Sequence, residues 1–241
     1  MEKPLKIYIG WDSREDIAWQ VCRHSLLRHA AGALEIHPLK QQALREEGLY
    51  TRPPDASTTE FSLTRFLAPS LADHEGWTLF ADCDFLFTTD IARLLDEVEP
   101  GKAVHVVKHR YEPAQSTEMD GRAQTAYRRK NWSSFMLFDN AHPACKALTP
   151  EIVNAASPLE LHQLEWLDDD SLIGGLSRSW NFLVGEYPVP EGLPHAIHFT
   201  NGGPWFRECS DVDFADLWRR ERELMWQGDN SSPVSGRPAQ Q

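Results

Sequence analysis

Short apolar runs alternate along this chain with stretches whose apolar residues recur at helical spacing. Residues 5–10 form the first run and residues 33–39 form the second. Small or apolar side chains between them share one helical face: Ile17, Ala18, Val21, Cys22, Ser25 and Leu26. The pattern predicts a strand, a helix and a second strand. Such a unit is right-handed with parallel strands, so it indicates an α/β fold with a mostly parallel sheet flanked by helices.

Local signals place the ends of several predicted elements. Ser13 and Asp16 resemble a capping box at the start of the first helix. Residues 41–59 are rich in Gly, Pro, Ser and Thr and predict a loop, whereas residues 60–71 predict a helix that Pro69 shortens. The remaining expectations are strands at 77–81, 103–109, 134–138 and 195–200, and helices at 90–98, 142–156, 168–177 and 213–227.

Two segments lack a regular period. Residues 111–130 have no helical or strand pattern, which is typical of a lid or binding loop. Residues 228–241 are rich in Ser, Pro, Gly and Gln and predict a disordered tail. The expected organisation is therefore one catalytic domain over residues 1–227, followed by that tail.

Composition narrows the functional classes. The chain has 241 residues, 41% of them hydrophobic, and a net charge of −12, so binding to nucleic acid is not expected. No apolar run is long enough to cross a membrane, and the N-terminus does not resemble a signal peptide. The four cysteines form no C-x-x-C pair, which favours a reduced, cytoplasmic protein over a disulfide framework.

Two aspartates interrupt the most apolar part of the chain. Asp82 and Asp84 flank Cys83, directly after the predicted strand at 77–81 and before three further apolar residues. Neighbouring carboxylates in an apolar setting repel each other and are costly to desolvate, so a divalent cation would stabilise both. Oxygen ligands suit Mg²⁺ or Mn²⁺. The alternative is a turn whose acids simply face water.

Other polar residues gather at the same predicted edge of the sheet. Asp12 follows the first strand, as Asp82 and Asp84 follow a later one, and ligands of open α/β sheets bind at the carboxyl ends of strands. His198 lies in the late apolar segment at 195–200. It is either a hydrogen-bonded core histidine or a third metal ligand.

The order of short motifs resembles the GT-A glycosyltransferases, and specifically glycosyltransferase family 8, which includes glycogenin and bacterial lipopolysaccharide galactosyltransferases. The likeness covers about residues 5–206. The motifs are Leu63-Thr64-Arg65-Phe66, Phe80-Ala81-Asp82-Cys83-Asp84, Asn131-Trp132-Ser133-Ser134, Leu167-Asp168-Asp169-Asp170-Ser171-Leu172, Trp180-Asn181 and Ile197-His198-Phe199-Thr200-Asn201-Gly202-Gly203-Pro204-Trp205. The resemblance implies the GT-A nucleotide-diphospho-sugar transferase fold, with a Rossmann-like sheet.

The resemblance also implies roles for the matching residues. Asp82, Asp84 and His198 would hold Mn²⁺ or Mg²⁺ on a nucleotide diphospho-sugar. The expected donor contacts are Asp12 at the base and ribose, Arg65 near the diphosphate, and Asn131, Ser133 and Gly202 around the donor. Asp168 and Asp169 would contact the donor sugar hydroxyls and, with Arg65, form the catalytic set. Without the resemblance, Arg65 could equally pair with a carboxylate, and the two aspartates could stabilise a helix N-terminus.

Several positions depart from the family pattern, and one of them is Asn201, which precedes Gly202. Gly203 stands where a lysine that holds the diphosphate is usual, Asp169 replaces a glutamine, and Ile173 replaces an asparagine. Arg207, Arg128, Arg129 and Lys130 are candidate substitutes for the lysine.

The leading hypothesis is a metal-dependent retaining hexosyltransferase that uses a nucleotide diphospho-sugar, with UDP-hexose as the expected donor. The acceptor would be a saccharide, a lipid-linked acceptor or a protein. The alternatives are a degenerate relative that binds a nucleotide or glycan without turnover, and a nucleotidyltransferase of similar fold. Trp11, Trp132 and Trp205 adjoin the motifs and are candidates for sugar contact.

Overall fold

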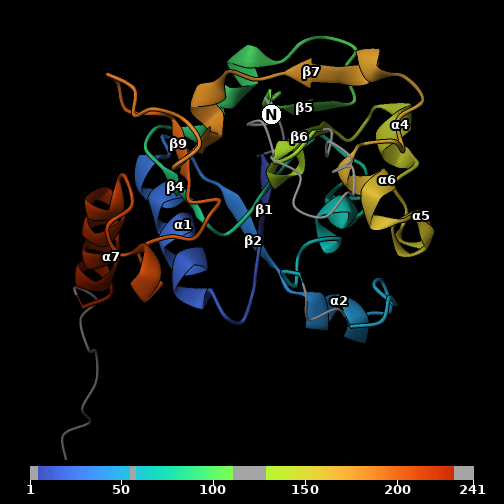
Figure 1. Cartoon of the computed structure of the whole chain (residues 1–241). Coiled ribbons are helices and arrows are strands. Elements are labelled where there is room, and N and C mark those ends of the chain that lie inside the picture. The colour runs from blue at the N-terminus through green and yellow to red at the C-terminus, as the bar shows by residue number, and fades with distance from the viewer. Residues whose placement is uncertain (1–4, 55–57, 111–128, 231–241) are drawn as a thin grey trace, which may run out of the picture.

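Six strands form the central sheet of the computed structural model, which describes residues 5–54, 58–110 and 129–230 (Figure 1). Their order across the sheet is β2-β1-β3-β6-β5-β7. Their bounds are β1 Lys6–Gly10, β2 Glu35–Leu39, β3 Trp77–Ala81, β5 Val104–Val106, β6 Phe135–Asp139 and β7 Ile173–Gly175. Five strands share one direction, and β6 runs antiparallel between β3 and β5. The expected mostly parallel α/β sheet is confirmed.

The innermost strands are apolar on both faces because helices or a second sheet cover both sides. Residues 78–81 of β3 and residues 135–138 of β6 are all buried. Continuous apolar runs of this kind are typical of sheets that lie inside an α/β protein. The edge strand β2, in contrast, is only partly buried along most of its length.

A small second sheet and two long helices form one side of the molecule. The sheet has the order β4-β9-β8, with β4 Phe85–Phe87, β8 Phe182–Leu183 and β9 Ala196–His198. The helix α1, Asp16–His29, packs against β4 and against α7, Ala215–Asn230 (Figure 1). This side therefore joins the start, middle and end of the chain.

The shorter helices are α2 Gln41–Glu46, α3 Ala68–Leu71, α4 Pro143–Lys146, α5 Pro150–Ala155 and α6 Pro158–His162. In Figure 1, α4, α5 and α6 lie on the side of the sheet opposite α1 and α7. Pro stands in the first turn of each of these three helices, where a missing amide hydrogen costs nothing.

Several predicted elements differ from the structure. The helix expected at 168–177 is a short 3₁₀ turn, Asp170–Leu172, followed by strand β7. The ring of His105 occupies the space beside Gly174, since a Cβ there would lie 2.2 Å from it. A bare glycine thus lets β7 lie against β5, where helical spacing alone had predicted otherwise.

The region before β3 also differs. The loop expected at 41–59 contains α2, and the helix expected at 60–71 is a 3₁₀ helix, Thr64–Leu67, followed by α3. Pro69 lies in the first turn of α3 and so begins that helix rather than ending one. The helix expected at 90–98 is a 3₁₀ helix, Ile91–Glu97.

The capping box expected at Ser13 and Asp16 is absent. Glu15 is the residue before α1, and it makes no side-chain cap. The Ser13 hydroxyl instead donates to the Glu60 carboxylate, which lies 47 residues further along the chain. A tertiary contact therefore replaced the local one.

At the C-terminal end, α7 runs to Asn230 and so continues three residues past position 227. The rest of the predicted tail and most of the irregular segment at 111–130 lie outside the described residues. Among the described helices, none combines the length and apolar character that a membrane span requires.

Candidate active site

The Asp82-Cys83-Asp84 turn joins the central sheet to the small sheet. It lies between the end of β3 and the start of β4. The Asp82 amide donates to the Ser134 carbonyl oxygen at 3.0 Å, and the Phe199 amide donates to the Asp84 carbonyl oxygen, also at 3.0 Å. Cys83 is buried between the two aspartates. Backbone contacts on both sides therefore hold the turn in place.

The turn and strand β9 bring three ligand groups together. Asp82, Asp84 and His198 each offer one ligand atom, and these atoms all lie within 4.8 Å of one another. His198 Nε2 is 3.3 Å from Asp84 Oδ2. Residues separated by more than a hundred positions thus form a group that could hold a metal ion.

Asn181 fixes which nitrogen of His198 faces the aspartates. The Asn181 amide nitrogen donates to Ser134 Oγ at 3.0 Å and to the Asn131 carbonyl oxygen at 3.2 Å. Its oxygen therefore faces His198 Nδ1, at 2.8 Å, so Nδ1 carries the hydrogen. The unprotonated Nε2 is left for a metal, and such oriented imidazoles are typical of metal ligands. The Phe85 ring stacks on the imidazole at 4.3 Å.

The aspartates carry more negative charge than their protein partners balance. Arg65 Nη1 lies 2.9 Å from Asp82 Oδ1 and also donates to the Ser133 carbonyl oxygen at 2.8 Å. Burial nevertheless raises the pKa of Asp82 to about 7, with Arg65 opposing the rise and Asp84 adding to it. Asp84 Oδ1 is buried and has no hydrogen-bond partner. A divalent cation would satisfy both carboxylates.

A cavity of about 330 Å³ opens beside this group. Asp82, Asp84 and His198 line it, and so do Glu15, Thr59, Phe61, Cys83, Asn131, Thr200, Gly202 and Phe206. Asn131 has a left-handed backbone with φ of 63°, and its buried Nδ2 has no hydrogen-bond partner. The cavity wall thus offers an unused donor beside the acidic group.

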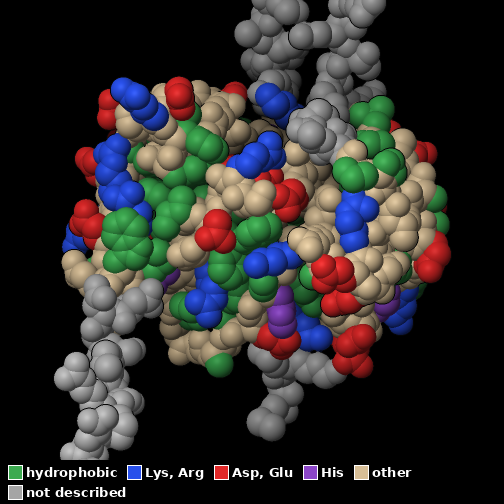
Figure 2. Space-filling view, turned by 90° about the horizontal axis from the view of Figure 1, so that it is seen from below, with side chains coloured by type: hydrophobic (Ala, Val, Ile, Leu, Met, Phe, Trp, Pro, Cys, Tyr) green, Lys and Arg blue, Asp and Glu red, His purple; other side chains and the backbone are tan. Residues whose placement is uncertain are grey.

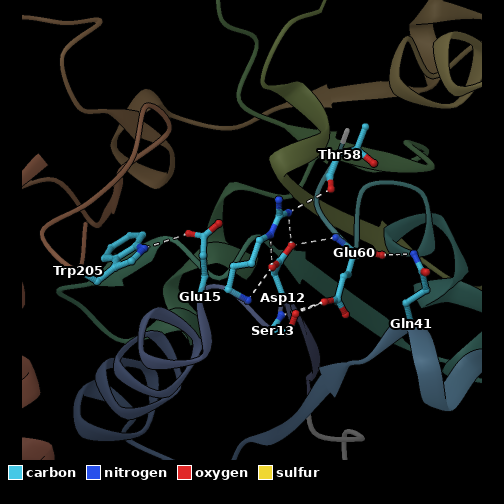
Figure 3. A network of polar contacts seen from close by, with 8 residues as sticks. Asp12, Ser13, Glu15, Gln41, Thr58, Glu60 and Trp205 are labelled. Carbon is cyan, nitrogen blue, oxygen red and sulfur yellow. Dashed lines mark hydrogen bonds and ion pairs between the residues drawn. The ribbon is translucent and has the colours of Figure 1, made fainter. Parts of the chain in front are cut away.

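Glu15 is a cavity residue that the sequence did not single out. Trp205 Nε1 donates to its carboxylate at 3.2 Å, and Figure 3 shows the indole and the carboxylate pointing toward each other. Burial raises the pKa of Glu15 to about 7, and the charges of Asp84 and Asp12 add to the effect. Glu15 follows the first strand, as Asp12 does, so its position in the sequence could have indicated it.

Asp12 lies behind the cavity, outside the set of described residues that line it. Its carboxylate accepts from Arg14 Nε at 2.8 Å, from Arg14 Nη2 at 2.7 Å and from the Glu60 amide at 3.1 Å (Figure 3). Burial would raise the pKa of Asp12, but these hydrogen bonds hold it below its ordinary value. Asp12 therefore organises the loop after β1, and its expected contact with the nucleoside stays a prediction.

The other expected site residues divide into two groups. Arg65 and Ser133 support the site from behind: Arg65 pairs with Asp82, and Ser133 Oγ is 2.8 Å from His162 Nδ1. Asp168 and Asp169 are exposed and are not among the described residues that line the cavity. Asp169 accepts from the Ser171 amide at 2.7 Å, which lowers its pKa.

The two glycines after β9 lie close to neighbouring side chains. Gly202 lines the cavity with φ of 99°, and a Cβ there would lie 2.9 Å from Cys209 Sγ. A Cβ at Gly203 would lie 2.0 Å from the ring of Trp205. Position 203 therefore has no room for a side chain while the indole keeps this place.

None of the candidate substitutes for the lysine lines the cavity among the described residues. Arg207 is exposed, and Arg129 pairs with Asp170 at 2.5 Å. Arg128 lies outside the described residues.

This sheet, with the acidic turn at the end of β3, defines the GT-A fold of glycosyltransferases. The WbbM bifunctional glycosyltransferase matches with a TM-score of 0.66 and 16% identity over 94% of this chain and 52% of that one. The glycosyltransferase GlyE of Streptococcus pneumoniae TIGR4 matches with a TM-score of 0.59 and 13% identity, over 98% of this chain and 66% of GlyE. The galactosyltransferase LgtC, solved with donor and acceptor sugar analogues, matches with a TM-score of 0.54 and 11% identity, over 93% of this chain and 99% of LgtC. The chain thus spans about half the length of WbbM.

A closer relative places the chain in a family. This chain and Protein CDI of Arabidopsis thaliana are 46% identical over 227 residues. The alignment covers 92% of this chain and 87% of Protein CDI. The chain belongs to the family of Protein CDI. No family model matches the sequence.

Proposed function

We propose that this protein is a metal-dependent glycosyltransferase that uses a nucleotide diphospho-sugar, with a UDP-hexose as the expected donor. The observation that carries the proposal is the meeting of Asp82, Asp84 and His198 beside a cavity, on a GT-A fold. The likeness to known glycosyltransferases supports the fold, and the side chains of this site supply the chemical argument.

The three side chains fit a hard divalent cation. Two carboxylates and an imidazole suit Mn²⁺, and Mg²⁺ is the alternative. Asp84 Oδ1 is a buried acceptor without a partner, as expected for an atom that needs a ligand. Bound there, the ion supplies positive charge that stabilises the leaving diphosphate.

The remaining residues would orient the donor. Asn131 Nδ2 is available to donate to it from the cavity wall. Arg65 holds Asp82 and so fixes the orientation of that ligand. We propose transfer with retention of configuration, as in family 8, with the acceptor attacking from the face that the diphosphate leaves. Catalytic roles for Asp168 and Asp169 remain part of the proposal and require the exposed segment to approach the donor.

The proposal is tested by measuring the binding of UDP with and without Mn²⁺ by isothermal titration calorimetry. We expect binding that needs the metal and that Asp82→Asn and His198→Ala each abolish, while the exposed control Asp213→Asn binds normally. Release of UDP from UDP-hexoses then measures turnover. Equal UDP affinity with and without Mn²⁺ would exclude the metal-dependent mechanism.

The glycine at position 203 favours a second candidate, a relative that binds the nucleotide without turnover. The indole of Trp205 occupies the space that a lysine would need. None of the described residues that line the cavity is Lys or Arg. Tight metal-dependent binding without UDP release from any donor and acceptor pair would favour this candidate. Release of pyrophosphate would instead indicate a nucleotidyltransferase.

A further inference from the structure

A second cavity, of about 440 Å³, lies beyond the end of β5 and is strongly cationic. Lys108, Arg110 and Arg178 line it, and none of its described lining residues is a carboxylate. The chain as a whole carries a net charge of −12, and Figure 2 shows acidic and basic side chains interspersed over one face of the molecule. A cavity with cations alone is therefore a local exception in an acidic protein.

The wall of this cavity contains a buried polar atom without a partner. His109 is 6% exposed, and its Nδ1 lies 2.8 Å from the Tyr187 hydroxyl. Its Nε2 is buried and makes no hydrogen bond within the described chain. Buried polar groups are nearly always satisfied, so such an atom beside a cavity indicates a ligand.

The neighbouring side chains are held in place around it. The Arg178 guanidinium lies over the Tyr187 ring at 4.8 Å, and Lys108 Nζ donates to the Ile173 carbonyl oxygen at 2.7 Å. An ammonium has three donors, and an arginine has five in a planar fork that matches a phosphate or carboxylate. Both cations thus keep donors for an anion.

Short contacts connect this cavity to the metal-binding group. Trp132 Nε1 donates to the His109 carbonyl oxygen at 3.1 Å, and Trp132 follows Asn131, which lines the first cavity. Burial lowers the pKa of His109 to about 3, and the nearby His198 and Arg178 add to the effect. His109 is therefore neutral, and Trp132 with its neighbour Asn131 connects the two cavities.

A third cavity, of about 620 Å³, shares Arg178 and Tyr187 with the cationic one. Its described lining is mostly apolar and includes Phe182, Pro188 and Leu193. Leu193 is 54% exposed. An anionic group in the cationic cavity would therefore have an apolar surface next to it.

We propose that the cationic cavity binds an oxyanion, a phosphate or carboxylate, carried by the acceptor. This inference rests on the proposed function, because it names the second substrate of the same site. The donor diphosphate belongs at the metal-binding group, so an additional set of cations beside it fits a second anion. Electrostatic attraction would hold the acceptor with its reacting hydroxyl toward the first cavity.

Binding to the metal-free protein in EDTA tests the inference without relying on turnover. The probes are glucose 6-phosphate compared with glucose, and farnesyl phosphate compared with farnesol, and equilibrium dialysis measures the binding of each. We expect each phosphate to bind and each neutral partner to bind at least tenfold more weakly. Preference for the sugar phosphate indicates a soluble acceptor, and preference for farnesyl phosphate indicates a lipid acceptor that also uses the apolar cavity.

Matched charge changes locate the binding site. Arg178→Gln and Arg110→Gln should each weaken phosphate binding roughly tenfold, because each removes a charge-assisted hydrogen bond. Arg23→Gln, an equal charge change at an exposed position of α1, should leave phosphate binding unchanged. Equal affinity for phosphates and neutral probes, or equal losses in all three variants, would overturn the inference. Metal-dependent UDP binding, measured on the same variants, reports on the proposed function separately.

Discussion

Two acidic triplets in this chain have nearly the same composition and opposite surroundings. Asp82-Cys83-Asp84 lies in a buried turn against an arginine and an imidazole, and the Asp82 side chain is 15% exposed. Asp168-Asp169-Asp170 lies at the surface, where the Asp170 side chain is 80% exposed. In the first triplet, Arg65 alone does not balance the two carboxylate charges. In the second, Asp169 caps a turn and Asp170 pairs with Arg129.

The difference shows what turns acidic residues into a site. Carboxylates in water need no partner, so a surface triplet gains little from a cation. Carboxylates enclosed by apolar neighbours are costly unless a positive charge joins them. Two features distinguish the first triplet. Its carboxylates are surrounded by apolar neighbours, and the His198 imidazole of β9 lies beside them.

Loss of a proposed metal ligand should have the largest effect. Asp84→Asn should weaken Mn²⁺ binding on the order of 100-fold or more, which exceeds the usual cost of changing a residue that only supports a ligand. Asp169→Asn is the matched control in the exposed triplet and should change the affinity by about twofold at most. Titration with Mn²⁺ by electron paramagnetic resonance measures both. Similar losses in the two variants would mean that the triplets do not differ in this way.

Loss of the side chain that orients His198 should have an intermediate effect. Asn181→Ala should weaken Mn²⁺ binding about 10- to 100-fold, because the imidazole loses the acceptor that fixes its tautomer. Asn154→Ala is the control, since this amide also bridges backbone groups, at Leu49 and Thr51, but in α5. Unchanged Mn²⁺ affinity in Asn181→Ala would argue against a ligand role for His198.

The acidic character of the first cavity should appear in the pH dependence of stability. The pKa of Glu15 is raised to about 7 in the folded protein from 4.5, so the folded state holds its proton more tightly. The resulting stabilisation is full below about pH 4.5 and is lost as pH rises through about 7. Glu15→Gln should therefore gain roughly 1–3 kcal/mol relative to the unchanged protein between pH 5 and pH 8.

Urea unfolding in EDTA at the two pH values measures this gain. Glu97→Gln is a suitable control, because Glu97 bonds Ser177 and Trp180 away from the first cavity. An identical pH dependence in Glu15→Gln and the unchanged protein would contradict the burial of charge at this cavity.

The smallest effect is expected in the exposed triplet. Asp170→Asn removes the ion pair with Arg129 and should cost about 1 kcal/mol or less of the free energy of unfolding. The loss should shrink further in high salt, because ions screen surface charges. Urea unfolding at low and high ionic strength provides the measurement. A salt-independent loss of several kcal/mol would show that this triplet is not simply a solvated surface.

Sequence reasoning was most successful where a pattern is long and periodic. The first strand, α1 and β2 were predictable because apolar residues recur over more than thirty positions. The strand β7 was not, since it has three residues and depends on how Gly174 accommodates the ring of His105. A contact of this kind is set by tertiary packing and leaves no local signal.

The site follows the same rule. Asp82 and Asp84 were recognisable from their apolar context, and the family resemblance brought His198 to them. Glu15 was missed as a site residue, and Asn181 belonged to a matching motif but had no expected role. Both roles depend on tertiary contacts, at the cavity for Glu15 and at His198 for Asn181. Asp168 and Asp169 matched a motif, but motif order carries no information about exposure.

The contact between Gly203 and Trp205 constrains how this family can change. A lysine at position 203 would require the indole of Trp205 to move, because its first side-chain carbon would lie 2.0 Å from that ring. A shift of the indole would break its hydrogen bond to Glu15. A basic residue at position 203 would therefore come with a different placement of the tryptophan, so positions 203, 205 and 15 are expected to change together.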